Sequence, residues 1–319
     1  MNLENLKKIC CLGAGTMGPG IALSFALAGY QVHMYSRSAA SIQRSFALIN
    51  DLLEKFAEHG LVEFAQISQI KAQIRGTTNL EEAAEDAGFV IEAIPENLTL
   101  KQELFAKMEQ LCPPATVFAS STSGLSTTAL AMNLQYKERF IVAHFWNPPH
   151  LIPLVEVAPG ESTSQNTVEF TTALLQKIGK KPVVLKKEAL GLIGNRLQLA
   201  MLREALALVE TGVASKEAVD TTIKYALGRR LAVTGPLESV DLGGLDIFQN
   251  IASYLIPDLC STAEVSPLLR GNVHKGRLGA KTGAGFYDWT PDSLQKIKKL
   301  REDDLLSWLN KDKKGYLDY

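Results

Sequence analysis

Two ionisable residues, His144 and Glu156, stand in an otherwise apolar run, AHFWNPPHLIPLVEV at residues 143–157. Burying an ionisable pair is costly unless the two groups satisfy each other. Imidazole titrates near neutral pH, and a carboxylate on its second ring nitrogen fixes the tautomer and stabilises the imidazolium. The pair could therefore act as a base on an alcohol hydroxyl, although from this segment alone a hydrogen-bonded core histidine is the commoner explanation.

A glycine-rich loop near the N-terminus offers a second kind of chemistry. In LGAGTMGPG, Gly13, Gly15 and Gly18 form G-x-G-x-x-G directly after an apolar strand and at the start of a helix. Such glycines allow a tight turn, close approach of the backbone to a pyrophosphate and close packing of helix on strand. The loop predicts dinucleotide binding by these glycines together with Thr16 and Met17, whereas a merely tight turn is the alternative.

The end of the second strand, VHMYSRS, bears on which dinucleotide is bound. NAD-specific domains usually place an acidic residue there to bind the adenosine ribose 2′-hydroxyl. Here the position is Ser36, followed by Arg37. A hydroxyl can donate to a 2′-phosphate and a guanidinium can pair with it, so the sequence favours NADP slightly over NAD. The alternative is that Arg37 is a solvated loop charge and NAD is used.

Alternating strand and helix patterns must position these residues. A helix that Gly29 ends follows the glycine loop, and residues 38–74 predict a helical hairpin split at Gly60. Thr99 and Gln102 resemble a capping box that opens a helix reaching Leu111. The predicted strands are 8–12, 31–35, 89–94, 116–119, 140–145, 151–157 and 182–185, and the predicted C-terminal helices are 192–211, 216–227, 238–254 and 294–309.

Composition narrows the class of protein. The 319 residues are 46% hydrophobic and 21% charged with a net charge of −1, which fits an ordinary globular protein of about two domains. No basic stripe suggests a nucleic-acid or membrane partner, so a small molecule is the expected ligand. The four cysteines form neither a disulfide framework nor a CxxC metal site, and no metal is expected. We read no signal peptide and no membrane span, and expect a cytoplasmic protein.

Several motifs in one order resemble the 3-hydroxyacyl-CoA dehydrogenase family over about 285 residues. They are CLGAGTMGPGIA, FVIEAIPENLTLKQELF, FASSTSGLS, HFWNPPHLIPLVEV, GLIGNRL, GPLESVDLGGLD and LGAKTGAGFYDW. The resemblance implies an α/β Rossmann-type N-terminal domain with an inserted helical hairpin, expected at residues 1–187. It also implies an all-α C-terminal domain at 188–319 that carries substrate and dimer contacts, a homodimer, and a role in fatty acid metabolism.

The resemblance also implies roles for individual residues. His144 looks like the family's catalytic histidine and Glu156 like its orienting partner. Ser123 matches a residue that hydrogen-bonds the reacting oxygen, and Asn195 matches a substrate-contacting asparagine. Either could instead cap a helix. Two further residues match positions lining the cofactor and active-site region: Glu96 and Lys101.

The substrate is less well defined by the motifs. Members acting on acyl-CoA commonly read S-N-T-S, where this chain has SSTS, and PVPVMKLVE, where it has PPHLIPLVE with Pro153 at the lysine position. That proline is more typical of relatives that oxidise free 3-hydroxy acids such as gulonate or carnitine. The C-terminal motifs look more like 3-hydroxybutyryl-CoA members, so a short 3-hydroxyacyl-CoA is favoured. A free 3-hydroxy acid is the alternative, and a non-catalytic dinucleotide-binding protein is a second.

Overall fold

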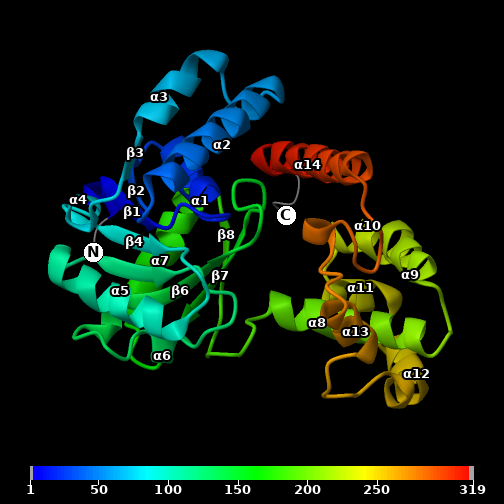
Figure 1. Cartoon of the computed structure of the whole chain (residues 1–319). Coiled ribbons are helices and arrows are strands. Elements are labelled where there is room, and N and C mark those ends of the chain that lie inside the picture. The colour runs from blue at the N-terminus through cyan, green and yellow to red at the C-terminus, as the bar shows by residue number, and fades with distance from the viewer. Residues whose placement is uncertain (1–2, 316–319) are drawn as a thin grey trace. The chain divides into compact units, whose positions relative to one another are not determined.

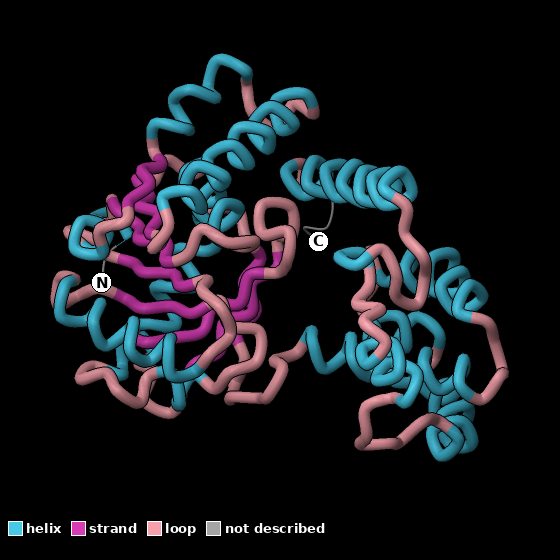
Figure 2. Tube along the Cα trace, in the orientation of Figure 1, coloured by secondary structure: helices cyan, strands magenta, loops and turns pink. Residues whose placement is uncertain are grey.

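A single sheet of eight strands organises the N-terminal half of the computed structural model, which describes residues 3–315 (Figures 1 and 2). The strand order is β3-β2-β1-β4-β5-β6-β7-β8, and among the strand pairs only β6 and β7 run antiparallel. The strands are β1 Lys8–Leu12, β2 Gln31–Tyr35, β3 Ile74–Thr77, β4 Phe89–Glu92, β5 Val117–Ser120, β6 Phe140–Phe145, β7 Leu154–Pro159 and β8 Lys181–Val184. The predicted Rossmann-type α/β fold is confirmed.

Helices cover both faces of this sheet, which explains why β1 is buried along its whole length. Ile9 and Cys11 pack into one core, whereas Cys10 and Leu12 pack into the other. The adjacent cysteines therefore point to opposite faces, and both are free thiols. One face is covered by α1 Gly18–Leu27, α2 Ala39–Glu58 and α7 Gln165–Lys177, and the other by α4 Leu80–Ala84, α5 Leu98–Leu111 and α6 Thr127–Leu130.

The switch in strand order at β1 and β4 defines where a ligand can lie. Strands β2 and β3 lie on one side of β1, whereas β4 and the later strands lie on the other. In such sheets a crevice opens at the carboxyl ends of the two strands at the switch point. Gly13 follows β1 there, and Ala93 follows β4.

Two compact units divide the chain: residues up to Asn195 with Leu305–Lys314, and residues Arg196–Asp304. The second is helical, as the sequence predicts, and the predicted start of this domain at residue 188 lies eight positions before Arg196. From the end of the first unit onward the helices are α8 Gly194–Glu210, α9 Lys216–Thr222, α10 Gly228–Leu231, α11 Pro236–Gly243, α12 Leu245–Leu255, α13 Pro267–His274 and α14 Pro291–Lys313. No helix within residues 3–315 has both the length and the apolar character needed to cross a membrane.

The end of α14 belongs to the first unit. Leu306 is buried in the core formed with α1, α2 and α7. Asn310 Nδ2 donates to the carbonyl of His59 at 3.1 Å, and Lys313 Nζ donates to that of Leu61 at 2.7 Å. The helix predicted at residues 294–309 is longer than expected and spans Pro291–Lys313. Its C-terminal end packs and hydrogen-bonds within the first unit.

Several local predictions were wrong. Helix α5 is capped by Asn97, whose side chain accepts from Leu100 N, so Thr99 does not open it. The predicted helix 238–254 is two helices, because Gly244 adopts φ +92° between them.

The helical hairpin exists as α2 and α3 Ile67–Ala72, but Ile74 begins strand β3. Within residues 3–315, five α-helices lie outside every predicted helical range: α4, α6, α7, α10 and α13.

Candidate active site

His144 and Glu156 face each other across the antiparallel strands β6 and β7. They are direct partners in the register of β6 and β7, so both side chains leave the same face of the sheet. His144 Nδ1 lies 3.0 Å from Glu156 Oε2, and both side chains are buried. The histidine can therefore hold its Nδ1 proton on the carboxylate and keep Nε2 for another partner.

Glu156 is satisfied by four hydrogen bonds. Oε2 also accepts from Trp146 Nε1 at 3.1 Å, and Oε1 accepts from the backbone N–H groups of Ile193 at 2.7 Å and Gly194 at 2.9 Å. Burial alone would raise the pKa of Glu156, but these donors and His144 hold it below its ordinary value. The carboxylate is thus an anion beside the imidazole.

Ser123 and Asn195 form a second pair. Asn195 Nδ2 donates to the backbone carbonyl of Ser123 at 2.9 Å, and the Ser123 side chain is exposed. Gly194, the residue before Asn195, donates to Glu156, and Phe145 N donates to Ser121 Oγ at 3.2 Å. These two links join the loop after β5 and the start of α8 to the His144–Glu156 pair.

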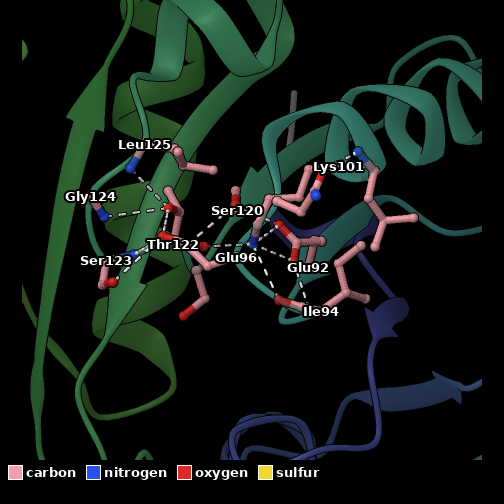
Figure 3. Close-up of polar contacts among 12 residues, drawn as sticks. Glu92, Ile94, Glu96, Lys101, Ser120, Thr122, Ser123, Gly124 and Leu125 are labelled. Carbon is pink, nitrogen blue, oxygen red and sulfur yellow. Dashed lines mark hydrogen bonds and ion pairs between the residues drawn. The ribbon is translucent and has the colours of Figure 1, made fainter. Parts of the chain in front are cut away.

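A buried ion pair lies beside the loop that carries Ser123 (Figure 3). Lys101 Nζ contacts Glu92 Oε1 at 2.7 Å and Glu96 Oε2 at 3.1 Å, and Ser120 Oγ donates to Glu92 Oε2 at 2.6 Å. Glu92 is 0% and Lys101 is 1% exposed. The two members of this pair come from the end of β4 and from α5.

Glu96 connects this ion pair to Ser123. Its Oε1 accepts from Thr122 Oγ1, and from Ser123 N at 3.1 Å (Figure 3). Burial works against the charged carboxylate, yet the Thr122 and Lys101 contacts keep the pKa of Glu96 below its ordinary value. Glu96 therefore bridges Lys101 and the backbone N–H of Ser123, since one carboxylate oxygen contacts Lys101 Nζ and the other accepts from Ser123 N.

The glycine loop has the geometry that a dinucleotide needs. A Cβ on Gly13, at φ +125°, would lie 2.6 Å from the carbonyl oxygen of Ala93, and one on Gly18 would lie 1.8 Å from that of Gly13. Gly15 instead faces open space, so its backbone is accessible to a ligand. Thr16 is exposed beside it, and Met17 precedes the first residue of α1. These residues fit a bound pyrophosphate.

A cavity of about 380 Å³ adjoins the loop on the side of β2. Ser36 and Arg37 line it, together with Ser38 and Ser41 at the start of α2. Within residues 3–315, no acidic side chain is among those that line this cavity. Glu96 and Lys101 do not line it either, and their predicted place near the cofactor stays a prediction.

Sequence reasoning missed three parts of the site. Glu92 was visible as a lone acid in the apolar strand FVIEAI, which could have indicated a buried partner. The sequence shows Trp146 next to Phe145 but gives no sign that its indole donates to Glu156. The Ile193 and Gly194 N–H groups left no signal, because backbone donors carry no residue signature.

Comparison with known proteins matches both halves of the chain to one family. The family model described as 3-hydroxyacyl-CoA dehydrogenase, NAD binding domain, matches residues 8–189, and that described as 3-hydroxyacyl-CoA dehydrogenase, C-terminal domain, matches residues 191–289. A 5-formyl-3-hydroxy-2-methylpyridine 4-carboxylate 5-dehydrogenase of Mesorhizobium japonicum is 35% identical, over 95% of this chain and 97% of the relative. A probable 3-hydroxybutyryl-CoA dehydrogenase of Bacillus subtilis is 38% identical, over 89% of this chain and 98% of the relative.

Among solved structures, one described as a 5-formyl-3-hydroxy-2-methylpyridine 4-carboxylic acid 5-dehydrogenase, an NAD+ dependent dismutase, superposes with a TM-score of 0.90. It is 34% identical, and the match covers 97% of this chain and 99% of that one.

Proposed function

The chain belongs to the 3-hydroxyacyl-CoA dehydrogenase family, a family of NAD-dependent oxidoreductases that act on CH–OH groups, and we propose that His144 is its catalytic base, oriented by Glu156. The observation that carries this proposal is the buried hydrogen bond of 3.0 Å between Nδ1 and Oε2. With Nδ1 bonded to the carboxylate, Nε2 is the nitrogen that can accept the proton of a substrate hydroxyl.

In the proposed oxidation, the substrate alcohol gives its hydroxyl proton to His144 and a hydride to the nicotinamide cofactor. The bound nicotinamide dinucleotide supplies the hydride acceptor. His144 Nε2 takes the hydroxyl proton, and Glu156 stabilises the imidazolium that results. Ser123 Oγ donates to the oxygen as it becomes a carbonyl, and Asn195 holds the Ser123 backbone and serves as a further neutral donor. In the reverse direction, His144 returns the proton to the new alkoxide.

For the substrate, we propose a small free acid that carries a hydroxyl or an aldehyde hydrate. The feature that supports this choice is α14, which lies beyond the family-model match ending at residue 289. Its Leu306 packs into the first core, so the extension is part of the fold. The relative whose match covers 95% of this chain is the pyridine-carboxylate dehydrogenase, whereas the Bacillus relative is matched over 89%.

A short 3-hydroxyacyl-CoA is the second candidate, supported by the match to the family models and by the Bacillus relative. Nicotinamide absorbance, followed with the pyridine aldehyde acid, gulonate, carnitine and acetoacetyl-CoA in turn, separates the two. We expect the highest kcat/KM with a free acid. A preference for acetoacetyl-CoA would overturn that choice, and dinucleotide binding without turnover of any of these compounds would favour a non-catalytic protein.

For the cofactor, we propose a modest preference for NADP(H). Binding of an NAD-type dinucleotide is a property of the family domain at residues 8–189. The cavity beside Gly13 and Gly15 is lined by the hydroxyls of Ser36, Ser38 and Ser41 and by Arg37. Hydroxyl groups and a guanidinium can bind a 2′-phosphate, whereas a carboxylate in the same place would repel it.

We also propose a homodimer formed through the helical domain, in the cytoplasm. Within the described part of Arg196–Asp304, Leu206 is the one large apolar side chain that is buried. Leu237 is 81% exposed and Leu242 78% exposed, and apolar side chains of α12 such as Leu245 and Ile247 are exposed as well. Soluble monomers rarely expose that much apolar surface. A symmetric copy of the same helices is the simplest cover for it.

A further inference from the structure

Trp146 shares an acceptor with the proposed catalytic base. Its Nε1 donates to Glu156 Oε2 at 3.1 Å, and His144 Nδ1 lies 3.0 Å from the same oxygen. The rings of Trp146 and His144 have their centroids 5.3 Å apart at an interplanar angle of 55°. One carboxylate oxygen thus serves an indole donor and an imidazole donor at once.

The start of α8 fixes the indole in this position. A Cβ on Gly194 would lie 2.2 Å from Trp146 Cζ2, so the indole packs directly against the backbone of Gly194. The N–H of Gly194 donates to the other oxygen of Glu156. The indole, the carboxylate and the first residue of α8 therefore hold one another in place.

Few other charges face His144. Among the described residues, Glu156 is the one acidic side chain within 4.0 Å of its ring nitrogens. On β8, Val183 lies opposite Glu156, and the charged Lys181 lies opposite Leu154 instead. Residues 117–120 of β5 are uncharged, and α8 begins with two uncharged residues before Arg196. The buried charges on β4 and α5, Glu92 and Lys101, are paired with each other.

We propose that Trp146 is a positioning residue that draws part of the charge of Glu156 Oε2 away from His144 and so sets how readily the imidazole is protonated. The kinetic part of this inference rests on the proposed function. Hydrogen bonds to one anionic oxygen compete, because each donor withdraws charge that the others would otherwise feel. Loss of the indole N–H leaves more negative charge for the imidazolium, so protonated His144 becomes more stable.

The test is Trp146→Phe, which keeps an aromatic ring and removes the N–H. We expect the NMR titration midpoint of the His144 ring protons, measured without substrate, to rise by about 0.5–1 pH unit. The acid limb of kcat/KM for alcohol oxidation should rise by the same amount, since the base must be neutral. The matched control, Trp289→Phe in the helical unit, should move neither.

The NMR titration of His144 and the kinetic measurement can fail independently of each other. A protein without dehydrogenase activity would end the proposed function, whereas the NMR titration would still test Trp146. An unchanged midpoint in Trp146→Phe, even with a lower kcat, would overturn the inference and leave Trp146 as a packing residue.

A wild-type measurement covers the case in which Trp146→Phe does not fold. The indole N–H signal of Trp146, identified by elimination with Trp289→Phe and Trp308→Phe, should shift with the same midpoint as His144. An indole signal that does not respond to that titration would contradict the shared acceptor.

Discussion

Replacing Lys101 by methionine tests whether the buried ion pair that it forms with Glu92 stabilises the fold as the geometry indicates. The change keeps most of the side-chain volume and removes the ammonium 2.7 Å from Glu92 Oε1. Glu92, which is fully buried, then keeps two neutral donors among the described residues, Ser120 Oγ and Ile94 N. Removing one partner of a buried pair typically costs about 3–5 kcal/mol, and we expect about 3 kcal/mol because those two donors remain.

The pH dependence of this loss has a definite sign. Burial already raises the pKa of Glu92, although Lys101, Ser120 and Ile94 N act in the opposite direction. Without Lys101 the folded state binds a proton at Glu92 more readily than the unfolded state does. Stability of the variant relative to wild type should therefore fall as the pH rises from 5 to 7.

Urea unfolding of wild type and Lys101→Met at both pH values, followed by circular dichroism and tryptophan fluorescence, measures these differences. Lys107→Met on the exposed face of the same helix is the control, and it should change the free energy of unfolding by less than about 0.5 kcal/mol. In a double-mutant cycle with Glu92→Gln the two losses should add to much more than the double variant shows. A loss for Lys101→Met below about 1 kcal/mol at pH 7, or additivity in the cycle, would refute the reasoning.

Three further predictions follow from the proposed roles. Glu156→Gln should lower kcat, because the imidazolium loses its counter-charge, but by less than loss of the histidine does; wild-type kcat in this variant would contradict the orienting role. The ratio of kcat/KM for NADPH over NADH should exceed one and fall in Ser36→Asp; a tenfold preference of wild type for NADH, about 1.4 kcal/mol, would show that Arg37 does not read a phosphate. Sedimentation at micromolar concentration should give about twice 34.8 kDa, and a monomer would refute the dimer.

Features set by local sequence were largely predictable. The glycine loop, the buried strands and the C-terminal end of α1 follow from spacing and from residues with special backbone preferences, such as Gly13 and Gly29. The facing of His144 and Glu156 was also predictable, since two adjacent strands joined by a turn place opposite residues on one face.

Features that depend on contacts between residues far apart in the sequence were not predictable. Helix α7 is 13 residues long, but its sequence QNTVEFTTALLQK is polar and rich in threonine. The sequence therefore did not indicate which face of this helix is buried against the sheet. Both Asn97 and Thr99 can cap a helix, and tertiary context selected Asn97. The contact of Trp146 with Gly194 joins residues 48 positions apart and has no local signature.

The central claim is that His144 acts as the base in the chemical step. The measurement that tests it most directly compares His144→Ala with wild type, with kcat measured on the best substrate of the panel and dinucleotide affinity measured separately by fluorescence titration. We predict that kcat falls by several orders of magnitude while the dinucleotide affinity stays nearly unchanged, because the imidazole acts in the transition state and not in cofactor binding. Turnover by His144→Ala within a few-fold of wild type would contradict the account.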